Sequence, residues 1–207
     1  MAVTINADTS NGLVMTPDTS GEIKLQSAGA DIATVNSSGI TMASGKGLAA
    51  TGHILQVVQA TKTDTFSSSS TSYTDVTGLS ASITPSSTSN KILVMVNFNA
   101  SVTATDNWHA YQILRGATAV HIGDTASSRT VASVGTALLT ATGSNNVIDN
   151  FSINYLDSPS TTSATTYKLQ GKVQSGQSFV INRSDLDADA SYGLRTASSI
   201  TLMEIAG

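Results

Sequence analysis

KILVMVNFNASVT, residues 91 to 103, is the stretch that decides the fold. Its apolar run ILVMV (92 to 96) leads into alternating apolar and polar residues, which predicts a long strand whose apolar run fills a core. Further apolar segments of strand length, separated by turn residues, occupy 54–66, 72–85, 111–123, 131–143, 146–158, 165–176, 177–184 and 198–207. About nine or ten strands in series predict an all-β sandwich or barrel.

The number and length of these strands favour a jelly-roll-like arrangement. The segment ITLMEI (200 to 205) is expected to be a central strand, buried on both faces. In residues 72 to 85 the expected core members are Val76, Leu79, Ala81 and Ile83. Gly116 stands where a hairpin turn is expected, and no segment has a helical period longer than about two turns.

The first fifty residues have a different character. Four short pieces ending in Ser, Asn or Gly read GLVMTPDTS, GEIKLQSAGA, DIATVNSSG and ITMASGKGLAATG. Strands of about four to six residues with few apolar members bury too little area to be stable alone, so they are expected to pack with copies of themselves as a stalk or anchor. The alternative is an ordinary N-terminal meander folded against the rest.

We therefore expect two domains. Residues 1–52 form the anchor or stalk, and residues 53–207 form the β-sandwich head, with GKGLAATGH (45 to 53) as a flexible joint. Intertwining with two other copies would remove the exposed strand edges of such a chain, which favours a trimer.

Composition excludes several classes of function. The chain of 207 residues has 40% hydrophobic but only 12% charged residues, about half the usual charged share, so Ser, Thr, Asn and Gly must cover its surface. A net charge of −4 without a Lys/Arg cluster argues against nucleic-acid binding and adhesion to anionic membranes. There is no cysteine, no apolar run of membrane-spanning length and no signal peptide, which fits synthesis in a host cytoplasm and assembly into a particle.

The histidines give no sign of a metal or catalytic site. His53, His109 and His121 lack metal-ligand spacing; His53 is assigned to the joint, and the other two are expected to be half-exposed. No G-x-S-x-G elbow is present. No cofactor is expected.

Two groups of carboxylates are weighed as candidate sites. Asp185, Asp187 and Asp189 alternate like the first ligands of a calcium loop, but Ala190 and Thr196 occupy the sixth and twelfth positions, so an EF-hand is excluded. A looser cation loop and a solvated loop remain the alternatives. The second group would serve a polysaccharide-cleaving spike, and its members lie at predicted loops or strand ends: Asp106, Asp124, Asp149 and Asp157.

Three residues are candidates for binding. Trp108, the only tryptophan, lies among polar residues before a strand. Its ring is expected either to pack at the sandwich edge, which is favoured, or to stack on a sugar or anchor an interface. Its neighbour His109 and the tyrosine Tyr192 are the other two candidates.

Several segments resemble virion proteins of tailed phages of the kind found in cyanobacterial and marine phages. The resemblance is carried by GLVMTPDTSGEIKLQ, VNSSGITMASGKGLAATGHILQVV, KTDTFSSSSTSYTDVTGLSASITPSSTSNKILVMV, YLDSPSTTSATTYKLQ and YGLRTASSITLMEI. It implies a tail-fibre-like or capsid-attached protein whose trimeric head is similar to TNF or C1q domains, with the N-terminal segment attached to the particle.

The expected function is therefore that of a non-enzymatic virion structural protein. A short fibre or fibre-like appendage that presents its head for host attachment is the first hypothesis, and a capsid decoration protein that stabilises the shell is the second. A polysaccharide-degrading spike and a free carbohydrate-binding module are further alternatives. The expected partners are two copies of the chain, other phage structural proteins, and a glycan or protein of the host surface.

Overall fold

The structure, a computed structural model, describes residues 21–44, 47, 51–102, 107–138 and 147–207. Every regular element in these ranges is a β-strand, as the sequence predicts. The chain divides into two compact units, residues 1–49 and residues 50–207. The predicted boundary between anchor and head lies at residue 52.

The first unit contains a three-stranded antiparallel sheet in the order β1-β2-β3. Its strands are β1 (Ile23–Ser27), β2 (Ala30–Asn36) and β3 (Gly39–Met42). Ala33 is the one buried apolar side chain among the described residues of this unit, while Leu25 and Ile40 are exposed. The described part of this sheet therefore has almost no core of its own, and the piece GLVMTPDTS lies outside the described residues.

The second unit, called the head below, consists of two antiparallel sheets. In the first head sheet β4 (Ile54–Lys62), β14 (Ser198–Ile205), β7 (Lys91–Val102) and β11 (Asp149–Asp157) lie side by side, and β13 (Phe179–Ile181) joins β5 (Phe66–Ser68) to the end of β7. The second head sheet contains β6 (Thr74–Ile83), β12 (Thr165–Val173), β8 (Asn107–Arg115), β10 (Val134–Leu138) and, paired with β8, β9 (Thr118–Val120).

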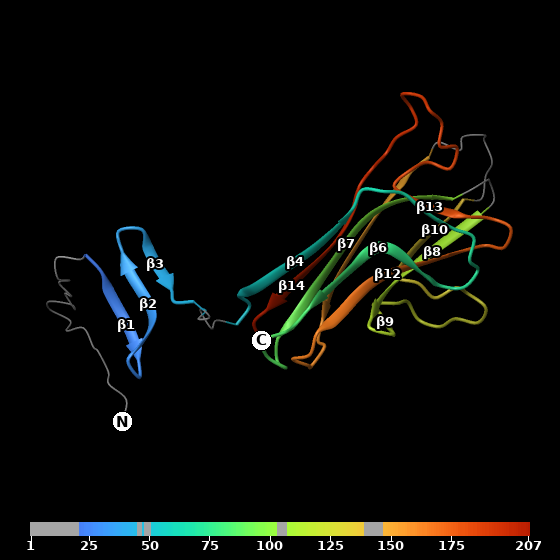
Figure 1. Cartoon of the computed structure of the whole chain (residues 1–207). Coiled ribbons are helices and arrows are strands. Elements are labelled where there is room, and N and C mark those ends of the chain that lie inside the picture. The colour runs from blue at the N-terminus through green and yellow to red at the C-terminus, as the bar shows by residue number, and fades with distance from the viewer. Residues whose placement is uncertain (1–20, 45–46, 48–50, 103–106, 139–146) are drawn as a thin grey trace, which may run out of the picture. The chain divides into compact units, whose positions relative to one another are not determined.

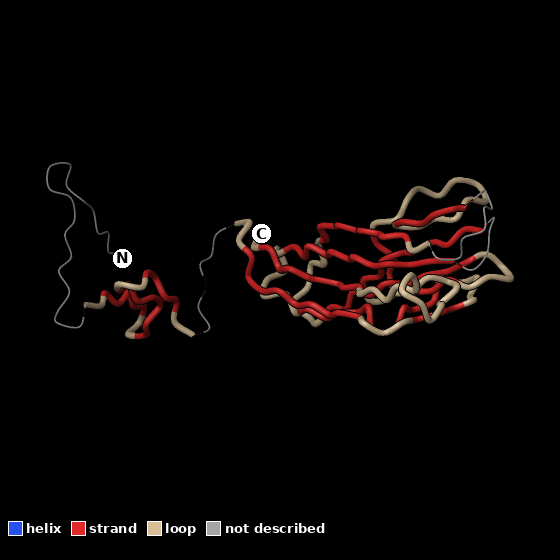
Figure 2. The backbone as a smooth tube through the Cα atoms, turned by 90° about the horizontal axis from the view of Figure 1, so that it is seen from above, coloured by secondary structure: helices blue, strands red, loops and turns tan. Residues whose placement is uncertain are grey.

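The chain passes repeatedly from one head sheet to the other. β6 belongs to the second sheet, β7 to the first, β8 to the second, β11 to the first and β12 to the second, before β13 and β14 return to the first. Figures 1 and 2 show the resulting layers. This alternation is typical of a jelly-roll-like sandwich.

The segment ITLMEI is a central strand, as predicted, because β14 lies between β4 and β7. Its inward residues Ile200 and Leu202 are fully buried. On the opposite face Thr201 is buried but Met203 is only half-buried, so the expectation of burial on both faces is met fully on the inner side and in part on the outer side.

One local irregularity sets the phase of β6. Val76 and Leu79 are both buried although they are three positions apart, which a regular strand does not allow. Gly78 lies between them with a φ of 88°, and the pairing of β6 with β12 shifts register beside it. This bulge turns Leu79, Ala81 and Ile83 inward, so all four predicted core members of this segment are confirmed.

The core lies between the two head sheets and is rich in aromatic rings. The rings of Phe98 and Tyr111 have centroids 4.7 Å apart, and Tyr111 meets Phe179 at 5.5 Å with their planes nearly perpendicular. The run ILVMV was expected to fill the core, but only part of it does so. Only Ile92, Val94 and Val96 point inward, because the alternation of a strand directs Leu93 and Met95 to the outer face.

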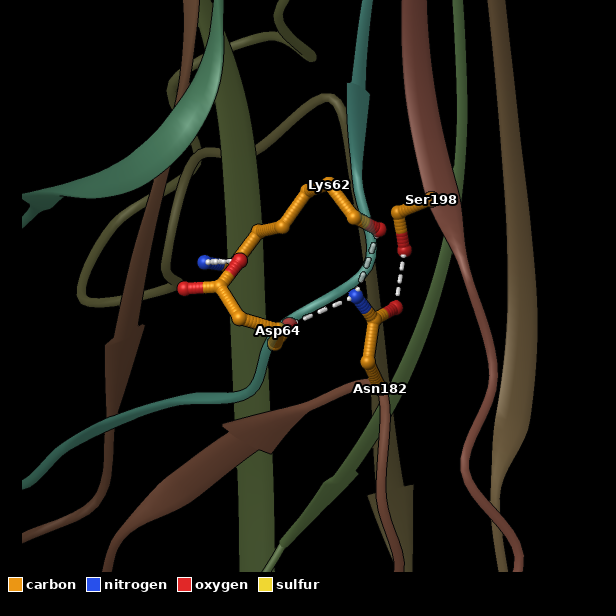
Figure 3. Close-up of polar contacts among 4 residues, drawn as sticks. All are labelled: Lys62, Asp64, Asn182 and Ser198. Carbon is orange, nitrogen blue, oxygen red and sulfur yellow. Dashed lines mark hydrogen bonds and ion pairs between the residues drawn. The ribbon is translucent and has the colours of Figure 1, made fainter.

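A fully buried asparagine ties several strands together (Figure 3). The Asn182 amide nitrogen donates to the carbonyl oxygens of Lys62 and Asp64, each at 2.9 Å, and its oxygen accepts a hydrogen bond from the Ser198 hydroxyl. Its φ of 63° lies in the left-handed region, which Asn tolerates better than most residues. The ends of β4 and β13 and the start of β14 are thereby joined.

The two ends of the head meet at one pole of the sandwich, called the base. The Gly52 amide donates to the Ala206 carbonyl, and the Ala206 amide donates to the His53 carbonyl, both at 2.8 Å. Gly52 and His53 therefore belong to the head, so the prediction that the joint extends to residue 53 is wrong at its last two positions. The loops 69–73, 174–178 and 182–197 lie at the opposite pole, called the far end (Figure 1).

The base is closed by a buried carboxylate. Glu204 accepts hydrogen bonds from Asn90, from Gln56 and from both the amide and the hydroxyl of Ser86. Burial alone would raise the pKa of Glu204, but these hydrogen bonds outweigh burial and hold the pKa below its ordinary value.

Candidate functional site

Trp108 lies at the start of β8, toward the far end of the second head sheet. The ammonium group of Lys172, on the neighbouring strand β12, is 5.4 Å from the centre of the Trp108 ring and 5.0 Å from that of Tyr73. Tyr73 is itself fixed, because its hydroxyl donates to the Val131 carbonyl at 2.6 Å, and burial raises its pKa to about 12. The Trp108 ring is thus held in place by its neighbours and is half-buried.

A cleft of about 620 Å³ opens beside this ring. Strands β8 and β10 and the segment 123–132 between β9 and β10 form its walls. Its polar lining residues are Asp124, Ser128, Arg129, Thr130 and Thr136. Neither the Asp124 carboxylate nor the Arg129 guanidinium forms an ion pair or side-chain hydrogen bond with another described residue.

Gly135 permits the close packing that shapes this cleft. A Cβ atom added there would lie 2.8 Å from the His109 carbonyl oxygen, closer than real Cβ contacts, and 3.2 Å from the Ala110 Cα, tighter than most of them. β10 can therefore approach β8 only because this position has no side chain.

The prediction that His109 is half-exposed is wrong. The register of β8 directs His109, Tyr111 and Ile113 to the core, and only 1% of His109 is exposed. Its Nδ1 is 2.8 Å from the Tyr111 hydroxyl, and its Nε2 has no hydrogen-bond partner in the described part of the chain. Burial lowers the pKa of His109 to about 4. His109 borders the cleft, but its imidazole packs against the rings of Tyr111 and Phe151.

Tyr192, the third candidate for binding, is exposed in the loop 182–197 and is not among the residues that line the cleft. The structure therefore brings Trp108 and the backbone of His109 to one cleft and leaves Tyr192 outside it. Asp124 and Arg129 were not singled out as binding residues by the sequence.

The three aspartates considered for a cation loop lie in the same far-end loop. Asp187 forms an ion pair with Arg195, and the Arg183 Nε lies 3.7 Å from its other carboxylate oxygen. Two arginines already neutralise this carboxylate. In the described ranges no group of three or more His, Asp or Glu residues is arranged to hold a metal ion.

The carboxylates considered for a polysaccharide-cleaving spike are dispersed. Asp157 is buried, accepts two hydrogen bonds from Arg115 at 2.8 and 2.9 Å, and accepts a third from the Tyr167 hydroxyl. Burial raises the pKa of Asp149. Among the described members of this group, Asp124 alone lines the cleft, and Asp106 lies outside the described residues.

No protein family model matches the chain, and no characterised protein matches it by sequence. Similar solved structures include the infectious bursal disease virus Gx strain, the VP2 subviral particle of that virus, and its T=1 particles. Each is 14% identical with a TM-score of 0.39, over 88–89% of this chain and 41–43% of the other. The chain thus spans less than half the length of these proteins, and so distant a likeness carries no inference about function.

In the described ranges we find no helix with the length and hydropathy that a membrane span requires.

Proposed function

We propose that this protein is a non-enzymatic structural protein of a phage particle, and that its head forms a homotrimer through the outer face of the first head sheet. The observation that carries the proposal is the composition of three rows of residues on that face: the row nearest the base is apolar, and the two rows beyond it carry no charge. Its residues are not used by the core of the single chain.

An apolar row crosses all four long strands of the sheet. Val57 pairs with Met203, Met203 with Leu93, and Leu93 with Leu156, so one side chain from each strand stands in line. Val57 is 54% exposed and Leu156 is 48% exposed. Covering such a row with another protein surface removes apolar area from water, which favours association by about 25 cal/mol per Å².

The neighbouring rows are polar but uncharged. Gln59, Thr201, Met95 and Asn154 form the next row, and Thr61, Ser199, Asn97 and Ser152 the one after it. Residues of these two rows line a hollow of about 350 Å³. Since the three rows contain no charge, two identical faces do not repel each other, and a second copy of this chain is the occupant that fits best.

The virion role rests on the first unit together with this face. The described sheet of β1, β2 and β3 buries almost nothing itself, as expected for a segment that is stable only against neighbours, here the other copies and the particle. The head joins the preceding residues at its base, which leaves the far-end loops free to face outward. The resemblance to tailed-phage proteins implies three copies, a virion location and attachment through the N-terminal segment.

Light scattering tests the trimer. At micromolar concentration we expect the mass of three chains, and Leu156→Glu or Val57→Glu should reduce it to that of one chain because each places a charge in the apolar row. Leu186→Glu is the matched control, since Leu186 is equally exposed but lies in the far-end loop. A monomeric wild-type protein would refute the proposal.

Labelled antibody against the head, viewed on intact particles by electron microscopy, distinguishes the two virion roles. Label at the tail supports a short fibre, which we favour for its free far-end loops. Label over the capsid surface supports a decoration protein that stabilises the shell, and particles without label contradict both.

A further inference from the structure

We propose that the cleft beside Trp108 binds a neutral saccharide. This inference rests on the proposed function, because it supplies the class of host-surface ligand that an outward-facing head would take. It is carried by three observations in the described part of the head: a fixed aromatic ring, two unpaired side chains of opposite charge, and a cleft whose walls are held in place.

The aromatic wall suits a sugar ring. Lys172 lies within cation–π distance of both Tyr73 and Trp108, so the tryptophan ring loses little freedom when a ligand arrives. A flat ring with an apolar face and a polar edge is suited to packing against the C–H face of a pyranose. The cleft volume of about 620 Å³ lies in the range of small-molecule sites and accommodates one or two sugar units.

The polar wall selects against charged ligands. Asp124 accepts hydrogen bonds and Arg129 donates them, while the hydroxyl of Thr130 does either. A ligand rich in hydroxyls offers partners to all three groups. An anionic sugar would face the Asp124 carboxylate, and a cationic ligand would face Arg129 and the Lys172 ammonium.

The loop that carries Asp124 and Arg129 is pinned to the head without a ligand. The Gly123 amide donates to the Ala132 carbonyl at 3.1 Å, and the Ser133 amide donates to the Tyr111 carbonyl at 2.8 Å. The Tyr73 hydroxyl bonds the Val131 carbonyl between them. Both ends of the segment are therefore fixed, so the loop loses little conformational entropy when a ligand binds.

The single tryptophan makes this site directly observable, because the tryptophan fluorescence of the protein comes from Trp108 alone. The full-length protein is titrated with methyl glycosides of glucose, galactose, mannose and N-acetylglucosamine and with their disaccharides. We expect a saturable fluorescence change with a Kd in the millimolar range for at least one of them. No saturable change with any of these sugars, or a change with sialic acid only, would overturn the proposal.

Variants locate the binding. Asp124→Asn and Arg129→Gln should each weaken it by about tenfold or more, since each removes a charged hydrogen-bonding partner of the sugar. Lys172→Met, which keeps the length of the side chain, should weaken it by releasing the Trp108 ring. Asp185→Asn and Tyr192→Ala, outside the cleft, are the controls and should bind as the wild type does. Binding unchanged in both cleft variants would exclude this cleft.

Light scattering on the same samples separates the two proposals. Loss of sugar binding in a protein that keeps the mass of three chains counts against the saccharide site alone. A wild-type monomer that binds sugar through Asp124 and Arg129 would contradict the trimer and support the site.

Discussion

His109 illustrates how a single buried side chain can set the response of this head to pH. It lies in the core with one ring nitrogen bonded to Tyr111 and the other without a partner among the described residues. Burial removes the charged imidazolium from water, which is the physical reason for its low pKa. The sequence did not reveal this, because nothing in DNWHAY shows which of two neighbouring residues turns inward.

We predict that His109 makes the head less stable in mild acid. Its pKa falls from 6.5 to about 4 on folding, so the unfolded chain binds the proton more tightly. This contribution to stability is fully present above pH 6.5 and is lost as the pH falls toward 4, by roughly 3 kcal/mol at most.

Chemical denaturation at pH 7 and at pH 4.5 measures the effect. His109→Phe fits among the surrounding rings and removes the titrating group, so its free energy of unfolding should fall less between the two pH values than that of the wild type. An equal fall in both proteins would show that other groups govern the acid response.

At the scale of the strands, the bulge in β6 links sequence to packing. Periodicity correctly predicted that Val76, Leu79, Ala81 and Ile83 face the core. Val76 and Leu79 are three positions apart, however, and would point to opposite faces of a regular strand. Gly78 resolves the conflict with a left-handed backbone that other residues adopt at a cost. An added Cβ would make only an ordinary van der Waals contact with the Lys62 side chain at 3.5 Å, so the backbone conformation is the constraint at this position.

Gly78→Ala should therefore destabilise the head by about 1 to 3 kcal/mol, through backbone strain rather than lost contacts. Thr77→Ala, at an exposed position of the same strand, is the control and should change the unfolding free energy by less than about 0.5 kcal/mol. Urea denaturation of both variants provides the comparison. Similar costs at the two positions would contradict the role given to the bulge.

The strands could be predicted from the sequence more fully than the candidate site. Alternation and turn residues indicated the strands of the head and the central place of ITLMEI, because each depends on local chemistry. The cleft depends on β8 meeting β10 and on a loop that returns across both. Trp108 stood out by its rarity. Asp124 was considered only as a catalytic carboxylate and Arg129 was not considered, and the fold placed both beside the tryptophan.

At the scale of the whole molecule, the two units differ in how much of their own surface they bury. The head has a core of aromatic and aliphatic side chains between its sheets. In the first unit, Ala33 alone among the described apolar side chains is buried. The two units should therefore differ greatly in stability when the chains are separated.

Hydrogen exchange measures this difference. In a protein dissociated by Leu156→Glu, we expect amides of β1–β3 to exchange nearly as fast as an unfolded chain, and those of β7, β12 and β14 to be protected up to the global unfolding free energy. In the assembled wild type the β1–β3 amides should become protected. Equal protection of β1–β3 in both states would show that this sheet is stable without neighbours.

The position of β14 has a consequence for how the head is made. β14 follows every other strand of the head in the sequence, yet it lies between β4 and β7 and pairs with both. Before β14 is inserted, the edges of β4 and β7 with which it will pair are open to each other and to any neighbouring chain. These two strands are separated by about thirty residues of sequence. Closure of the first sheet is therefore a late event during synthesis, and a nascent head is most exposed to mispairing with its own sister chains just before its last strand is inserted.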